Sequence, residues 1–192
     1  MDYRFLIHII GLLLASPKKA WQEISSLSFQ SCLTLFVFPM IALAALASFL
    51  GCLMRVGISG AEQYQYAMRQ CCSLAVALFA GFFLSAYLTN TVGLRFMSQA
   101  DSPLRSQVLC GYGMVVVMLM DILTALFPDL GLLALLGNFY TVYVIWEGVP
   151  RLYPSLMDDT MRLRMTALVS ALLLIVPYVI QRVFNQLSMA LG

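Results

Sequence analysis

Long apolar runs separated by short polar stretches are the dominant pattern of this chain. Five of the runs approach the ~20 residues that a helix needs to cross the hydrocarbon core of a bilayer. The five predicted spans are residues 32–54, 71–94, 106–127, 130–146 and 166–187. The third and fourth fold back on each other at Phe127-Pro128-Asp129. The pattern therefore predicts an all-α integral membrane bundle of five transmembrane helices within residues 30–192.

Residues 1–29 have a different pattern, which predicts two amphipathic helices and no sixth span. The first apolar run, within residues 1–15, is too short to cross, and its polar or small positions follow one helical stripe. These positions are Arg4, His8, Gly11 and Ala15. Ser16 and Pro17 then begin a second helix, as N-cap and first helical residue. The first helix is expected to lie in the membrane interface or on the bundle, and the second is expected to be an interfacial helix.

The second of these helices has an apolar and a polar face. The apolar residues are Ala20, Trp21, Ile24 and Leu27, and the polar ones are Lys18, Lys19, Gln22 and Glu23. Because Trp and Lys are common at the level of the lipid headgroups, Trp21 and the two lysines predict a headgroup anchor. His8 is the single histidine of the chain and is expected to have no catalytic or ligand role.

The second predicted span contains a row of small residues spaced four apart. They are Ser73, Ala77, Gly81, Ser85, Thr89 and Gly93. Such a row lets helix backbones approach closely, which drives helix association inside lipid. Since each step of four residues drifts by about 40°, the row winds about halfway round the helix and is expected to contact two neighbours. A polar pathway lined by Ser85, Thr89 and Asn90 is the alternative.

Prolines and capping residues predict where helices bend and begin. Pro39, inside the first span, predicts a kink. The segment Ser59-Gly60-Ala61-Glu62 predicts that the second helix begins before it enters the bilayer. A cap from Ser155 to Asp158, with an ion pair of Asp158 and Arg162 at a spacing of four residues, predicts a short surface helix before the fifth span. The fourth span is the most polar and is therefore expected inside the bundle.

Asp121 lies in the apolar third span, where an unpaired carboxylate is costly. At ~1.5 Å rise per residue, Asp121 and Arg182 fall within about 3 Å of the same depth in the outer half of the bilayer. We therefore expect an ion pair between them, with Asn138 as a further hydrogen-bond donor. The alternative is that Arg182 extends toward the headgroups, while Asp121 is protonated or faces a wet cavity.

Glu147 closes the fourth span at the level of Arg95 and Arg151. This placement predicts a local ion pair at the cytoplasmic interface, and a solvated carboxylate is the alternative. Glu147 and Asp121 lie at opposite ends of a helical hairpin, so they are not expected to form a catalytic pair of acids.

Composition and charge agree with the membrane assignment. Hydrophobic residues make up 61% of the chain and charged residues 10%, whereas soluble domains average about 25% charged residues. With the N-terminus inside, the cytoplasmic cations are Arg4, Lys18, Lys19, Arg95, Arg105, Arg151, Arg162 and Arg164, against Arg55, Arg69 and Arg182 outside. Lys and Arg concentrate on the cytoplasmic side, so we expect the N-terminus inside and the C-terminus outside.

Several classes of function are disfavoured by the residues present. A net charge of +2 gives no basis for nucleic-acid binding. The cysteines Cys32, Cys52, Cys71, Cys72 and Cys110 are expected to be packing residues, with a link from Cys52 to Cys71 or Cys72 as the alternative. No nucleophile–base pair, metal-ligand cluster or phosphate-binding loop is found in the sequence. We therefore expect no enzymatic activity, cofactor or metal.

The order of these features resembles the Yip family, five-span membrane proteins named for interaction with Ypt/Rab GTPases, and its bacterial branch in particular. The matching segments are Ser16-Pro17-Lys18-Lys19-Ala20-Trp21-Gln22-Glu23-Ile24, Pro39, Gly111-Tyr112, Trp146-Glu147-Gly148 and Val176-Pro177. A proline that family members often carry soon after Gly-Tyr is absent from residues 113–117. The Asp-Leu-Tyr-Gly-Pro segment and long arm of eukaryotic members are also missing, which makes GTPase binding doubtful.

The resemblance implies an integral membrane protein of the bacterial inner membrane. From it and from the residues we expect a non-enzymatic scaffold, which organises the lipid bilayer or binds other membrane proteins or itself. The alternative is a small transporter or channel that uses Asp121, Asn138 and the band of Ser85, Thr89 and Asn90 as a polar track.

Overall fold

The computed structural model describes residues 3–25, 33–58, 60–97, 103–154 and 158–190, and these ranges contain helices and no β-strand. The elements are α1 (Tyr3–Ala15), α2 (Pro17–Ser25), η1 (Leu33–Val37), α4 (Phe38–Val56), α5 (Ala61–Met97), α6 (Pro103–Gly113), α7 (Val115–Leu126), η2 (Pro128–Leu130), α8 (Gly131–Leu152) and α9 (Asp159–Ala190). The segments long and apolar enough to cross a membrane are Leu35–Val56, Ala61–Gly93, Pro103–Leu126, Pro128–Leu152 and Asp159–Ser188. The predicted all-α fold with five such helices is confirmed.

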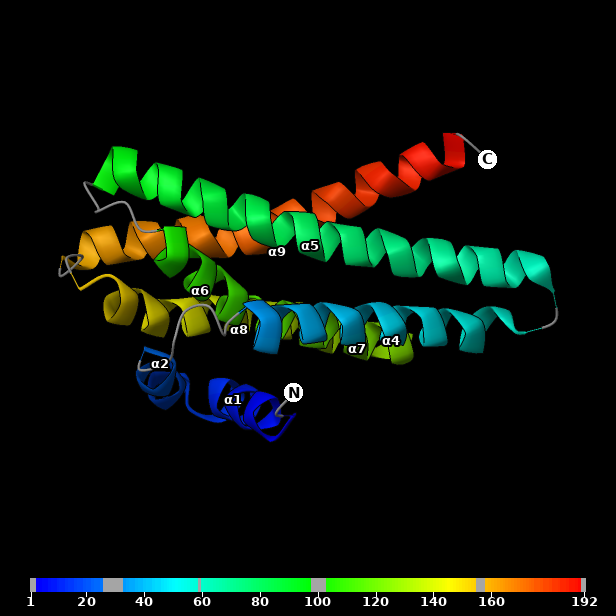
Figure 1. The fold of residues 1–192 in the computed structure, drawn as a ribbon, viewed down its shortest axis with the longest axis horizontal. Coiled ribbons are helices and arrows are strands. Elements are labelled where there is room, and N and C mark those ends of the chain that lie inside the picture. The colour runs from blue at the N-terminus through cyan, green and yellow to red at the C-terminus, as the bar shows by residue number, and fades with distance from the viewer. Residues whose placement is uncertain (1–2, 26–32, 59, 98–102, 155–157, 191–192) are drawn as a thin grey trace.

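Helix α5, the longest helix described, packs against α4, α6 and α9 (Figure 1). Helix α8 packs against α7 and α9 and also carries α2, so the two N-terminal helices lie along one edge of the bundle. The 37 residues of α5 extend about 55 Å at ~1.5 Å per residue, well beyond a hydrocarbon core of ~30 Å. The helix begins at Ala61, ten residues before the start of the span 71–94 that the sequence predicts.

The third membrane-crossing segment consists of two helices, α6 and α7, that meet at Met114. The backbone ladder continues across the junction, because Met114 N–H donates to the Cys110 carbonyl at 2.9 Å and Met118 N–H donates to Met114 at 3.0 Å. In the first segment, Pro39 is the second residue of α4 and follows the π-helical turn η1. A proline there interrupts little of the helical ladder. Pro39 thus lies at a change of helix type near the start of the span.

The polar fourth span is a peripheral helix, so its expected place inside the bundle is wrong. Only 33% of the membrane window of α8 is buried, against 61% for the α6–α7 segment. Leu132, Leu136 and Phe139 are 60–74% exposed, whereas Thr141 is fully buried. Thr141 turns inward, whereas Tyr143 is 48% exposed and the aliphatic majority faces the position of the lipid. Counting polar residues therefore overestimated how deeply the whole helix is buried.

The connector before the fifth span differs from the predicted surface helix. Helix α8 continues to Leu152 and α9 begins at Asp159, so the described part of this connector contains no separate helix. Asp158 instead caps α9, since its carboxylate accepts a hydrogen bond of 3.4 Å from Thr160 N–H. Arg162 does not pair with Asp158, because it reaches back to α8.

The four cysteines in the described residues are Cys52, Cys71, Cys72 and Cys110, and all are free thiols. The alternative link from Cys52 to Cys71 or Cys72 is therefore not formed. Cys32 lies outside the described residues.

Candidate functional site

Trp21 joins the N-terminal helices to the bundle. Its side chain is fully buried, and its indole N–H donates a hydrogen bond of 2.8 Å to the Val144 carbonyl in α8. A Cβ added at Gly148, one turn further along α8, would lie only 2.5 Å from the indole ring, so glycine makes room for it. The interpretation of Trp21 as a headgroup anchor is wrong, because the apolar face of α2 is covered by α8 instead of lipid. Lys18 and Lys19 remain exposed.

Residues that carry the resemblance meet at this junction, although they are far apart in the sequence. The rings of Trp21 and Tyr112 are edge-to-face with centroids 6.2 Å apart, and the ring centroids of Phe36 and Tyr112 are 4.5 Å apart. Helix α1 is tied to the same surface, since the Tyr140 hydroxyl donates to the Leu14 carbonyl at 2.9 Å. We call Trp21, Tyr112, Val144 and Gly148 the tryptophan junction.

The row of small residues on α5 lies against two neighbouring helices. A Cβ at Gly81 would approach the Pro177 ring of α9 to 2.7 Å, and the Ser85 hydroxyl donates to the Leu172 carbonyl of α9 at 3.3 Å. Thr89 contacts Cys110 of α6 at 3.6 Å. The remaining members of the row, Ser73, Ala77 and Gly93, are buried. Ser85 and Thr89 therefore take part in contacts between helices.

Replacing Gly81 with leucine is expected to destabilise the detergent-solubilised protein by about 1–3 kcal/mol, because the new side chain would overlap Pro177. Thermal unfolding in micelles measures the change. Ala80→Leu is the matched control, since Ala80 is the neighbouring residue of α5 and is only partly buried. Equal melting of Gly81→Leu and the parent would contradict the close approach of α5 and α9.

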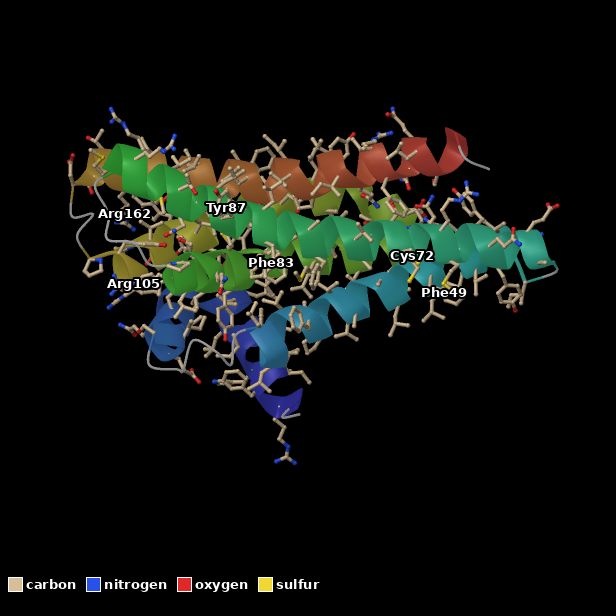
Figure 2. The ribbon with its side chains drawn as sticks, turned by 45° about the horizontal axis from the view of Figure 1, so that its top comes forward. Phe49, Cys72, Phe83, Tyr87, Arg105 and Arg162 are labelled. Carbon is tan, nitrogen blue, oxygen red and sulfur yellow. The ribbon has the colours of Figure 1, made fainter. Side chains whose placement is uncertain are left out.

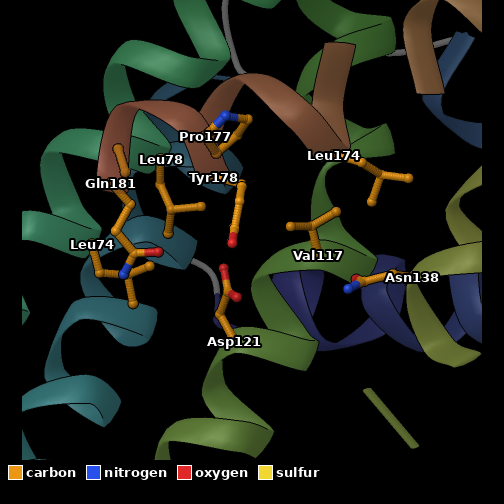
Figure 3. A pocket seen from close by; sticks show the side chains of 10 residues that line it. Leu74, Leu78, Val117, Asp121, Asn138, Leu174, Pro177, Tyr178 and Gln181 are labelled. Carbon is orange, nitrogen blue, oxygen red and sulfur yellow. The ribbon is translucent and has the colours of Figure 1, made fainter. Parts of the chain in front are cut away.

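Asp121 lines a cavity of about 110 Å³ between α5, α7, α8 and α9. Its polar lining consists of Asp121, Asn138, Tyr178 and Gln181, and the remaining walls are apolar. Figure 3 shows Asp121 and Tyr178 pointing toward each other, with Gln181 further along α9 and Asn138 on α8. The structure thus brings the predicted Asp121 and Asn138 to one cavity. Tyr178 and Gln181 were not predicted.

Arg182 does not complete this cluster. Its Nε donates a hydrogen bond of 3.1 Å to the Tyr178 hydroxyl, and its guanidinium lies over the Tyr178 ring at 5.3 Å. Among the residues that the structure describes, Asp121 has no ion pair with Arg182. The expected pair is not formed. Equal depth along two helices does not determine the direction in which each side chain points. A tyrosine one turn away on α9 holds the arginine instead.

Arg162 contacts the end of α8, whereas the sequence predicts that it pairs with Asp158. Arg162 Nη2 donates to the Trp146 carbonyl at 2.9 Å, and its guanidinium lies 3.9 Å from the centre of the Trp146 ring. Glu147 forms no ion pair within the described residues, and both Arg95 and Arg151 are exposed. The expected pair of Glu147 with either arginine is therefore not formed.

Tyr153 and Ser106 form a buried polar contact just beyond α8. Their hydroxyls share a hydrogen bond of 2.8 Å. Burial raises the pKa of Tyr153 to about 12, although the hydrogen bond with Ser106 lowers it. Tyr153 is therefore a neutral hydroxyl at physiological pH and does not serve as a base.

Tyr153→Phe is expected to destabilise the protein by about 1 kcal/mol at neutral pH, because Ser106 loses its buried partner. The raised pKa of Tyr153 means that the unfolded chain ionises first, so the stability of the parent falls as the pH rises from about 10 toward 12. The stability of Tyr153→Phe does not fall in this way, so the difference in stability between the parent and the variant narrows as the pH rises. Unfolding midpoints across pH measure both effects, with the exposed Tyr64→Phe as control. A difference in stability that stays constant across this pH range would contradict the raised pKa of Tyr153.

A second, larger cavity of about 310 Å³ lies between α5 and α6. It is lined by Phe83, Ala86, Tyr87, Asn90, Pro103 and Gln107. Phe83 and Tyr87 lie along α5, on a side that is partly exposed (Figure 2). Asn90 therefore belongs to a cavity that shares no lining residue with the cavity around Asp121.

Comparison with known proteins identifies the family of the chain. The family model of the Yip1 domain matches residues 10–180, most of the 192-residue chain. No curated protein and no solved structure matches it. The matched region contains the whole tryptophan junction, the row of small residues on α5, and every lining residue of the cavity around Asp121 except Gln181.

Proposed function

Because the chain belongs to the Yip1 domain family, and is a polytopic membrane protein, we propose that it is a non-enzymatic scaffold of the Yip type. In this proposal the bundle holds α1 and α2 at a fixed place on the membrane, where they gather anionic lipid. Other membrane proteins, or a second copy of the chain, would assemble on that organised patch of bilayer.

The tryptophan junction is the observation that carries the proposal. A buried indole with a hydrogen bond to a helix carbonyl is a rigid link, since both the apolar and the polar part of the ring are satisfied. The link leaves Arg4, Lys18 and Lys19 exposed on α1 and α2. A positioned set of cations next to a bilayer attracts anionic headgroups, at about 1 kcal/mol for each charge near the surface.

A transporter is less well supported by the same structure. The residues expected to form a polar track point to different places: Ser85 bonds to α9, Thr89 contacts α6, and Asp121 lines its own cavity. Gly81 also packs closely on Pro177, so α5 and α9 are in direct contact next to that cavity. Helices that pack this closely support a static bundle.

The lipid part of the proposal is tested in vesicles of phosphatidylcholine with a minority of phosphatidylglycerol. Energy transfer from a donor placed on α2 to labelled phosphatidylglycerol should exceed transfer to labelled phosphatidylcholine. The double variant Lys18→Gln, Lys19→Gln should reduce this preference by roughly 25-fold, at about fivefold per charge. Arg55→Gln, an exposed cation at the end of α4, is the matched control. Equal transfer to both lipids in the parent would overturn the proposal.

The transport part is tested in the same vesicles by flux assays for protons, monovalent cations and small solutes. A scaffold should give the leak of protein-free vesicles. Flux that depends on the protein, and is lost in Asp121→Asn, would replace the scaffold proposal with the transporter.

We further propose that the chain lies in a bacterial inner membrane, as the resemblance to the bacterial branch implies. The Lys and Arg distribution supports an N-terminus in the cytoplasm. Single cysteines at Lys18, Arg105 and Arg151, in a background without native cysteines, should be shielded from a membrane-impermeant reagent in intact cells. A cysteine at Arg55 should react. Labelling at Lys18 but not at Arg151 would contradict this topology.

A further inference from the structure

The cavity around Asp121 contains two oxygen acceptors that no protein group satisfies. Within the described residues the Asp121 carboxylate has no hydrogen bond or ion pair. The Asn138 side-chain oxygen is buried and has no partner there either. An unsatisfied acceptor in an apolar environment costs free energy, and an unpaired carboxylate in a membrane costs more. Both acceptors require a partner that supplies positive charge or hydrogen-bond donors.

The protein does not supply that charge. Asp121 is the one charged residue of the lining, which contains no Lys, Arg or His. The guanidinium of Arg182, on the same helix as the lining residues Tyr178 and Gln181, is bonded to the Tyr178 hydroxyl. This hydrogen bond gives the tyrosine oxygen a donor and keeps the arginine out of the cavity.

Size and charge together define the kind of ligand that this cavity would bind. A cavity of about 110 Å³ holds only a few water-sized groups at ~30 Å³ each, so a lipid headgroup does not fit. Carboxylate, amide and hydroxyl oxygens are ligands for hard cations. One carboxylate neutralises one positive charge, whereas a divalent ion would leave a net charge of +1 inside the hydrocarbon, which is strongly unfavourable.

From these observations we infer that the cavity binds a small monovalent cation of the sodium type, held by Asp121 and by the side-chain oxygens of Asn138 and Gln181. The ion links α7, α8 and α9, which supply these three residues. Its effect is to lock the outer half of the bundle. The inference concerns binding alone, so it goes beyond the scaffold proposal and does not depend on it.

The test measures thermal unfolding of the purified full-length protein in detergent, with NaCl replaced by N-methylglucamine chloride at constant ionic strength and pH. The midpoint should rise by roughly 3–5 °C for each tenfold increase of Na⁺ above its dissociation constant. Asp121→Asn, which keeps the shape and removes the charge, should lose this response. Asp129→Asn is the matched control, because Asp129 is an exposed acid in the adjacent turn and its variant should respond like the parent.

Direct binding keeps the inference testable if Asp121→Asn fails to fold. Binding of ²²Na⁺ to the parent should saturate near one ion per chain, and Asn138→Ala should weaken it. A parent midpoint that is the same in both salts, an undiminished response of Asp121→Asn, or a response to Mg²⁺ or Ca²⁺ alone would overturn the site. Vesicle flux is a separate outcome, since cation flux would overturn the scaffold proposal and leave the binding site in place.

Discussion

Trp21→Ala is expected to destabilise the protein by about 3–5 kcal/mol, the largest effect of any single substitution considered. The indole is fully buried and fills the space above Gly148, so its removal leaves a cavity between α2 and α8. The Val144 carbonyl keeps its bond within the helix and loses the indole donor. The unfolding midpoint in micelles measures the loss of stability, and protease cleavage near residues 26–32 measures release of the N-terminal helices.

Two further variants separate the causes. Trp21→Phe keeps most of the ring and removes the N–H donor, so it should cost only about 1 kcal/mol. Trp146→Ala removes the other tryptophan of the chain, which is partly exposed and stacks on Arg162. It should cost clearly less than Trp21→Ala. If both alanine variants melt alike and release α1 and α2 equally, the tryptophan junction does not hold the N-terminal helices.

The membrane-spanning elements could be predicted because their signals are local. Run length and hydropathy predict five apolar helices, and Phe127-Pro128-Asp129 predicts the turn between the third and fourth spans, where the structure has η2. The small residues of α5 are likewise visible as a spacing of four. Such features need no knowledge of which helices are neighbours.

Contacts between side chains could not be predicted in the same way. Depth along a helix follows from the rise per residue, but the direction of a side chain depends on how each helix is rotated and where it bends. The third segment changes element at Met114, and α9 begins seven residues before its predicted span. The pair of Asp121 and Arg182 failed for this reason. Tyr178, four residues before Arg182 on the same helix, was the local signal that could have indicated the observed contact.

The burial of Trp21 shows a different limit. An amphipathic helix with Trp and Lys fits a membrane interface and the side of a bundle equally well, because both cover one apolar face. The sequence contains no local feature that distinguishes a lipid cover from a protein cover. Only the position of α8, and the gap at Gly148, decides between them.

Gly51→Ala is the second substitution with a large expected effect, at or above about 3 kcal/mol. A Cβ at Gly51 of α4 would collide with the carbonyl oxygen and carbon of Ala125 in α7. These are backbone atoms of a regular helix, so they cannot rotate away as the end of a flexible side chain can. The two helices would have to separate along their contact, which loses packing at the neighbouring buried residues Ala47 and Cys52. Ala47 and Gly51 are spaced four apart, so a small-residue signal was present in the first span as well.

Gly11→Ala is the matched control for this prediction. Gly11 also lies within a helix, α1, but a Cβ there would meet no atom within 4 Å. Alanine has the higher helix propensity, so Gly11→Ala should leave the stability unchanged or raise it by up to ~1 kcal/mol. The unfolding midpoints of the two variants in micelles should therefore move in opposite directions from the parent. If Gly51→Ala is as stable as Gly11→Ala, then α4 and α7 do not touch at this position, and the contact of the first and third membrane segments lies elsewhere along their length.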